Sequence, residues 1–294
     1  MKKKLIFEGV ATALVTPMHK EKIDYTSVSR IINHQIESGV SAIVVGGTTG
    51  EVATLTEEEK DELYTYAREK IAGKAKLVLG VGTNDTRAVE RRVKSAEKIG
   101  CDGLLVVTPY YNKGTFRGVT EHYKRIAGST DLPIILYNVP SRTGVNLTIS
   151  QLEELAKIEN IVAIKEASDS LDRLTELSFF GDELYLYSGN DSQIYLTLAL
   201  GGRGVISVVS NLYPKEISNM CSLYFEGKGQ ESFFIQRRLF GLIKVLFQET
   251  NPTPIKYAMS LSGLCSSEVR LPLFEPENST RDAIKREIEK LAQV

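Results

Sequence analysis

The sequence has few of the residues that build disulfide frameworks and metal sites. Its 294 residues include only three cysteines and three histidines. The cysteines, Cys101, Cys221 and Cys265, are odd in number and form no CxxC pair, which argues against a disulfide framework or a zinc site. The histidines show no paired ligand spacing. We therefore expect buried thiols in a reducing, cytoplasmic compartment, and no metal.

An excess of one charge and a long apolar run are also missing. Lysine and arginine number 36 against 37 aspartates and glutamates, so no field attracts nucleic acid or an anionic membrane. No window approaches the roughly 18 uninterrupted apolar residues that span a bilayer. The apolar stretch after Lys2, Lys3 and Lys4 is too short for a secretory signal. We expect a globular protein with small-molecule partners.

Eight short apolar runs, rich in β-branched residues, alternate with helical patterns over the first two-thirds of the chain. Most runs are continuous, which is typical of strands covered on both faces. Between them, Thr56 with Glu59 and Thr148 with Gln151 have the spacing of capping boxes at helix starts. The predicted strands are residues 10–16, 42–45, 77–81, 103–108, 134–137, 161–164, 184–187 and 204–209.

Eight strand–helix repeats predict an α/β fold, a (β/α)8 TIM barrel. The alternative is an open, doubly wound sheet. A nucleotide-binding sheet of that kind carries GxGxxG after its first strand, whereas Val15, Thr16 and Pro17 stand there in this chain.

The strand pattern stops after residue 209, and helical spacing follows over 214–225, 231–248, 254–264 and 279–292. Residues 233–247 are apolar on too many sides for a lone surface helix, which predicts burial against the barrel or another subunit. We interpret residues 1–228 as the barrel and 229–294 as a C-terminal helical domain, an oligomerisation module.

Lys165 is the sharpest chemical signal. Barrel active sites lie at the carboxyl ends of the strands, and Lys165 ends a strand with no other charge. Its side chain therefore faces the barrel interior or the helix layer, where burial favours the neutral amine that attacks a carbonyl. The alternative is a structural lysine paired with a carboxylate such as Glu166.

Other strand ends supply complementary chemistry. Tyr137 ends the preceding strand and can transfer a proton. Thr48 and Thr49, in a glycine-flanked turn, offer amides and hydroxyls to a carboxylate, and Arg142 can grip a second one. Taken singly, each residue also has a purely structural explanation. Tyr137 fills the barrel interior, the threonines form a turn, and Arg142 is a solvated loop charge. Together they fit an amine nucleophile, a proton relay and two carboxylate clamps.

The motifs that contain these residues resemble those of the dihydrodipicolinate synthase family of class I pyruvate-dependent aldolases. They are GGTTGE at 46–51, YNVPSRTG at 137–144 and IKEA at 164–167, and the likeness extends to residues 7–17 and 188–207. The resemblance implies a lyase of lysine and diaminopimelate biosynthesis, a 4-hydroxy-tetrahydrodipicolinate synthase. In such an enzyme Lys165 forms a Schiff base with pyruvate, whose enamine adds to L-aspartate 4-semialdehyde, without any cofactor.

The resemblance also implies roles for individual residues. Thr49, Tyr137 and Tyr111 would form a proton relay, with Tyr111 reaching in from a neighbouring subunit. This arrangement implies a homo-oligomer, and the apolar C-terminal helices favour a tetramer built from tight dimers, although a dimer also satisfies Tyr111.

By the same resemblance, Thr48 and Thr49 would bind the pyruvate carboxylate, Arg142 the semialdehyde carboxylate, and the backbone of Ile206 would lie near the lysine. Arg142 separates this chain from the related N-acetylneuraminate lyases, whose sugar-acid substrates need a hydroxyl-rich site. A catalytically silent barrel used for binding or assembly is a further alternative.

One region departs from the family pattern. Feedback-inhibited relatives bind lysine at the subunit interface through a serine, a histidine and a glutamate, and the corresponding positions here are Val52, Lys60 and Ala88. A cationic inhibitor would lose its balancing carboxylate and meet Lys60 instead. We expect weak or absent inhibition by lysine.

Overall fold

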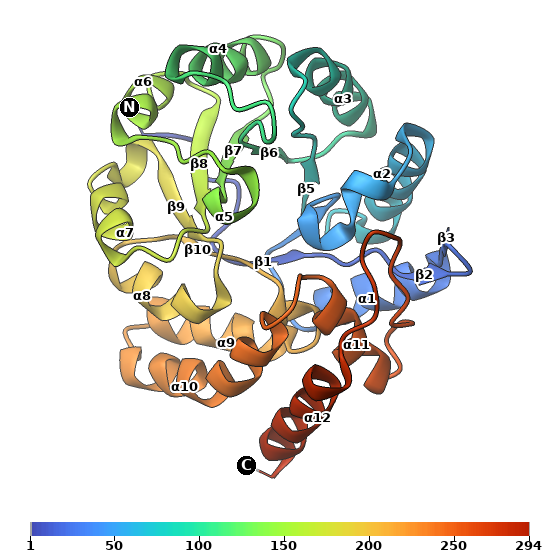
Figure 1. Ribbon diagram of the computed structural model, residues 1–294. Helices are drawn as coiled ribbons and strands as arrows, with labels where there is room; N and C mark the ends of the chain where they lie inside the picture. Colours follow the sequence, from blue (N-terminus) through green and yellow to red (C-terminus); the bar gives the residue numbers. More distant parts are fainter. Residues whose placement is uncertain (1, 294) are drawn as a thin grey trace.

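The computed structural model describes residues 2–293, which form a closed barrel of eight parallel strands (Figure 1). Each strand pairs with its sequence neighbour in the barrel, and β1 closes the ring against β10. The predicted TIM barrel is confirmed, and the open sheet is wrong. The barrel strands are β1 (Gly9–Ala13), β4 (Ala42–Val45), β5 (Lys76–Gly80), β6 (Gly103–Val107), β7 (Ile134–Asn138), β8 (Ile161–Glu166), β9 (Tyr185–Ser188) and β10 (Gly204–Ser207). A separate hairpin joins β2 (Met18–His19) to β3 (Lys22–Ile23).

Helices surround the barrel as an outer ring (Figure 1). Both predicted capping boxes are present, at Thr56 with Glu59 and at Thr148 with Gln151. The ring and its connections contain α1 (Tyr25–Glu37), α2 (Glu57–Ile71), α3 (Thr86–Ile99), α4 (Phe116–Ala127), α5 (Pro140–Thr143), α6 (Ile149–Leu155), α7 (Leu171–Ser178), α8 (Ile194–Ala199) and α9 (Pro214–Phe225). Short 3-10 turns are η1 (Thr48–Gly50), η2 (Val52–Thr54), η3 (Gly181–Glu183), η4 (Asp191–Gln193) and η5 (Val209–Asn211).

The strands are buried on both faces, as their continuous apolar sequences predict. One set of side chains, including Val44 and Ile135, fills the barrel interior, and a larger set, including Leu77 and Leu104, packs between strands and helices. Each fully buried aliphatic side chain of this kind stabilises the fold by about 1.5–3 kcal/mol. This rigid core fixes the strand ends that carry the site.

Three further helices follow the barrel: α10 (Gly229–Leu246), α11 (Thr253–Leu261) and α12 (Asn278–Ala292). The long helix α10 packs against α8, α9 and α12 (Figure 1). Its face with Leu239, Leu242 and Ile243 is buried, while Phe233 and Phe234 stay exposed in the single chain. The helix is therefore buried against the barrel on one side only.

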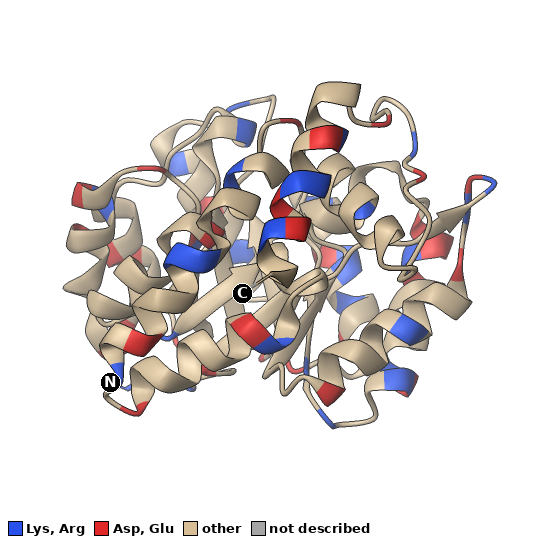
Figure 2. Cartoon of the chain, turned by 90° about the horizontal axis from the view of Figure 1, so that it is seen from below, with Lys and Arg blue, Asp and Glu red and all other residues tan. Residues whose placement is uncertain are grey.

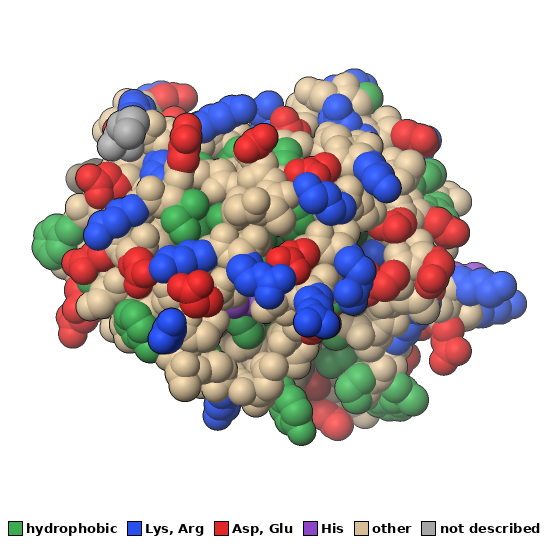
Figure 3. Space-filling view, turned by 90° about the horizontal axis from the view of Figure 1, so that it is seen from above, with side chains coloured by type: hydrophobic (Ala, Val, Ile, Leu, Met, Phe, Trp, Pro, Cys, Tyr) green, Lys and Arg blue, Asp and Glu red, His purple; other side chains and the backbone are tan. Residues whose placement is uncertain are grey.

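The surface carries no segregated charge in the views drawn. Basic and acidic residues are interspersed along the helices in Figure 2 and over the face shown in Figure 3. Among the described residues, no helix is long and apolar enough to cross a membrane.

Candidate active site

A pocket of about 400 Å³ opens at the carboxyl ends of the strands. Its lining brings together five predicted residues, Thr48, Thr49, Tyr137, Arg142 and Lys165. The opposite wall comes from residues 247–251, between α10 and α11. The sequence predicts the five strand-end residues, whereas residues 247–251 were not among the predicted site residues.

Lys165 lies inside the barrel mouth with 5% of its surface exposed. Its Nζ atom lies 4.3 Å from the centroid of the Tyr137 ring, on the neighbouring strand. Within residues 2–293, no carboxylate forms an ion pair with this Nζ atom. The amine is therefore held between an aromatic face and the pocket.

Glu166, next to Lys165 on β8, points to the opposite face of the strand, as alternation requires. Its carboxylate accepts two hydrogen bonds from Asn138 Nδ2, at 2.9 and 3.0 Å, and pairs with Arg173 Nε at 3.3 Å. The backbone amide of Ser168 donates to the same carboxylate. The alternative in which Lys165 pairs with Glu166 is therefore wrong, and Glu166 instead fixes the end of β8.

Asp191, in η4, orders the segment after the last strand. Its buried carboxylate accepts from Ser207 Oγ at 2.5 Å and from the backbone amides of Val208 and Val209. Burial raises the pKa of this carboxyl group. The Asp191 contacts hold the chain at Val208, which lines the pocket, in place.

The threonine turn follows directly from β4 and depends on glycine. Gly46 has φ of 76°, and a Cβ atom built on it would lie 1.9 Å from the Tyr64 hydroxyl. The turn then forms η1, in which the Thr49 hydroxyl accepts a 2.9 Å hydrogen bond from Asn251 Nδ2. A residue of the C-terminal helical segment thus touches a predicted substrate-binding residue.

The last residue of the turn, Glu51, is anchored from behind. Its carboxylate pairs with Lys256 Nζ at 2.6 Å, and both side chains are almost fully buried. Lys256 also donates to the backbone carbonyl of Thr16, whose hydroxyl donates to that of Gly50. These bonds tie the threonine turn to α11 and to the segment after β1.

Three predicted residues differ in their relation to the pocket. Arg142, in α5, lines it and donates from Nη2 to the backbone carbonyl of Asn251 at 3.0 Å. Tyr111 is 89% exposed, adopts a left-handed φ of 69°, and does not line the pocket of its own chain. Ile206 is buried in the barrel interior, while Val208 two residues later lines the pocket.

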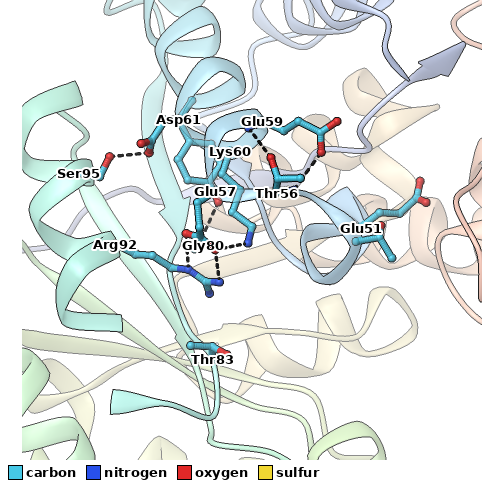
Figure 4. Close-up of polar contacts among 12 residues, drawn as sticks. Glu51, Thr56, Glu57, Glu59, Lys60, Asp61, Gly80, Thr83, Arg92 and Ser95 are labelled. Atoms are coloured by element: carbon cyan, nitrogen blue, oxygen red, sulfur yellow. Dashed lines mark hydrogen bonds and ion pairs between the residues drawn. The ribbon is translucent and has the colours of Figure 1, made fainter. Parts of the chain in front are cut away.

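Lys60, one of the three positions that depart from feedback-inhibited relatives, belongs to a charge network at the start of α2 (Figure 4). Lys60 Nζ pairs with Glu57 at 2.8 Å, and Arg92 pairs with the same carboxylate at 2.7 Å. The hydrogen bond from Arg92 is the main cause that lowers the pKa of Glu57 to about 2. Two cations therefore share one carboxylate here.

No group of three or more His, Cys, Asp or Glu side chains in residues 2–293 is arranged to hold a metal ion. All three cysteines are free and buried.

Comparison with known proteins gives consistent matches along the chain. The dihydrodipicolinate synthetase family matches residues 6–291. A 4-hydroxy-tetrahydrodipicolinate synthase of Clostridium novyi is 46% identical over 285 residues, which cover 97% of this chain and 96% of that protein. The corresponding enzyme of Thermotoga neapolitana is 44% identical, covering 95% and 97%. The crystal structure of dihydrodipicolinate synthase from Thermotoga maritima has a TM-score of 0.96 and 41% identity, covering 99% and 100%.

Proposed function

The chain belongs to the dihydrodipicolinate synthetase family, and from this premise we propose that it is a 4-hydroxy-tetrahydrodipicolinate synthase. This lyase condenses pyruvate with L-aspartate 4-semialdehyde in lysine and diaminopimelate biosynthesis. The observation that carries the proposal is the buried Lys165 amine, unpaired with any described carboxylate and placed over the Tyr137 ring in the pocket.

The reaction begins when the Lys165 amine attacks the ketone carbon of pyruvate. Loss of water gives a protonated imine, and loss of a methyl proton converts it to an enamine. The enamine carbon bonds to the semialdehyde aldehyde, whose oxygen takes up a proton. The amino group of the semialdehyde then displaces Lys165 from the imine carbon and closes the ring. Tyr137 is positioned to transfer the protons of these steps.

The two substrate carboxylates bind at different ends of the pocket. Thr48 and Thr49 hold the pyruvate carboxylate through their backbone amides, and Arg142 holds that of the semialdehyde. The Thr49 hydroxyl is engaged by Asn251, whereas the Thr48 hydroxyl makes no hydrogen bond to any residue that the structure describes. A relay hydroxyl must both accept and donate a proton, and the Thr49 oxygen already accepts from Asn251, so Thr48 is better placed than Thr49 for the relay. We expect the backbone of Ile206 to lie near the Lys165 amine.

The working form is a homo-oligomer, a tetramer of two tight dimers, in which Tyr111 completes the relay of a neighbouring subunit. The support is the exposure of Tyr111, a large aromatic residue on a strained backbone that serves no contact in its own pocket. A cytoplasmic location fits the three free cysteines.

Reduction with borohydride in the presence of pyruvate tests the proposal. The adduct should form on Lys165, as identified by peptide mass spectrometry. Lys60, another lysine with little exposed surface, serves as the internal control and should remain unmodified. Pyruvate should react with aspartate semialdehyde and not with N-acetylmannosamine. No adduct, or an adduct on another lysine, would overturn the assignment.

A further inference from the structure

Asn251 makes contacts with both ends of the proposed substrate pocket. Its side-chain amide donates to the Thr49 hydroxyl at 2.9 Å, and its backbone carbonyl accepts from the Arg142 guanidinium at 3.0 Å. Thr49 and Arg142 follow different barrel strands, in η1 after β4 and in α5 after β7. One residue of the C-terminal segment therefore contacts both carboxylate-binding elements.

Among the residues that the structure describes, the Asn251 side chain bonds only to the Thr49 hydroxyl. It is 6% exposed, and its Oδ1 atom has no hydrogen-bond partner among residues 2–293. Leaving a buried polar atom unpaired costs about 1–3 kcal/mol, so a purely structural asparagine normally satisfies both ends of its amide. Within the described part of the chain, the contact with Thr49 is thus the only polar interaction that the side chain contributes.

The direction of this hydrogen bond decides where the Thr49 proton points. A hydroxyl has one proton to donate and lone pairs to accept. Because Asn251 Nδ2 is the donor, the Thr49 oxygen is occupied as an acceptor, and its proton stays free to bond with an anion in the pocket. Thr49 itself is held in place, since Glu51 of the same turn is anchored by the buried Lys256.

We propose that Asn251 is a positioning residue of the enzyme: it polarises and orients the Thr49 hydroxyl toward the keto-acid carboxylate and fixes its spacing from Arg142. The inference rests on the proposed function. With this role for Asn251, the segment between α10 and α11 contributes to keto-acid binding as well as to packing.

Replacing the amide tests the proposal. Asn251→Asp keeps the shape but removes the donor, so the Thr49 proton must turn toward the new carboxylate and away from the substrate. We expect the KM for pyruvate to rise about tenfold or more, because hydrogen bonds to charged groups have about this weight. Asn251→Ala should raise it by less, since it adds no negative charge, and kcat should fall less than kcat/KM in both variants.

A double-mutant cycle separates positioning from folding. Thr49→Val should raise the KM for pyruvate, and Asn251→Ala should add no further increase on the Thr49→Val background. Asn160→Ala is the matched control: Asn160 is another asparagine that donates from Nδ2, but its acceptors are the backbone carbonyls of Ala127 and Thr130, outside the pocket. It should leave the KM for pyruvate unchanged.

These experiments separate the role of Asn251 from the activity of the enzyme. Additive effects in the cycle, or a lower melting temperature with an unchanged KM, would overturn the role of Asn251. If borohydride nevertheless traps pyruvate on Lys165 in the wild-type protein, the proposed function stands without a positioning role for Asn251. If the wild-type protein forms no adduct, the proposed function itself fails.

Discussion

The Nζ atom of Lys165 lies 4.3 Å from the centroid of the Tyr137 ring, and the two residues are paired across neighbouring barrel strands. The aromatic face thus packs against the amine, while the Tyr137 hydroxyl makes no hydrogen bond within the described chain. The ring and the hydroxyl of this residue therefore have separable roles.

Tyr137→Phe should leave the fold intact and slow the reaction. The ring still covers Lys165, but the proton donor is gone, so we expect kcat to fall by about 10²–10⁴. Steady-state kinetics and urea unfolding measure the two effects. Tyr185→Phe is the control, because the Tyr185 hydroxyl bonds to the Lys3 backbone instead. A kcat within threefold of wild type would exclude Tyr137 from proton transfer.

Mixing two inactive variants tests whether Tyr111 acts in a neighbouring subunit. Tyr111→Phe lacks the relay hydroxyl, and Lys165→Ala lacks the nucleophile. If Tyr111 crosses the interface, co-assembled mixtures contain sites that combine both intact residues, and about a quarter of the sites recover activity. Each variant alone is the control. Recovery would be absent if Tyr111 served only its own chain.

Arg142→Lys should weaken binding of the semialdehyde and leave pyruvate binding nearly unchanged. A guanidinium binds a carboxylate through two parallel hydrogen bonds, which an ammonium does not reproduce. We expect the KM for the semialdehyde to rise about tenfold, with a change of at most about threefold for pyruvate. Arg117, an exposed residue of α4, provides the control substitution Arg117→Lys. Equal changes for both substrates would contradict the assignment.

Lysine should inhibit weakly or not at all. The Lys60 ammonium is already paired with Glu57, which Arg92 shares, so the Glu57 carboxylate is not free for a bound cation (Figure 4). A steady-state inhibition constant below the millimolar range would refute this expectation. Conversely, the triple variant Val52→Ser, Lys60→His and Ala88→Glu should gain inhibition by lysine, because it restores the residue types of feedback-inhibited relatives.

Stability should decrease as the pH falls from about 6.5 to about 4, in part because of His122. Burial lowers the pKa of this histidine from 6.5 to about 4, and its Nε2 atom has no hydrogen-bond partner within the described residues. The unfolded chain therefore binds a proton that the folded chain rejects in this window, which costs up to about 3 kcal/mol.

Urea unfolding at pH 7 and pH 4.5 measures this effect. His122→Asn should show a smaller difference between the two pH values than the wild type does. His19→Asn, on the exposed hairpin, should show the wild-type difference. An unchanged pH dependence in His122→Asn would rule out the assignment to His122.

The fold and the strand-borne half of the pocket were predictable because their signals are local. A strand covered on both faces is apolar along most of its length, so the charge of Lys165 stands out in the sequence. The capping boxes likewise depend on residues three positions apart, and η1 directly follows its strand.

The other wall of the pocket had no such signal. Asn251 is an ordinary polar residue before a proline, and only the docking of α10 and α11 brings it to Thr49, 202 positions away in sequence. The Glu166–Arg173 pair was missed for the same reason, since the side to which Glu166 points depends on strand alternation together with the position of α7.

Because residues 247–251 form one wall of the pocket, a chain leaving the ribosome finishes its strands well before it finishes its catalytic centre. During that interval the Lys165 amine lacks the wall that faces it, and the threonine turn lacks its tether. Synthesis therefore separates completion of the barrel strands from completion of the pocket, whose last wall follows only with residues 247–251.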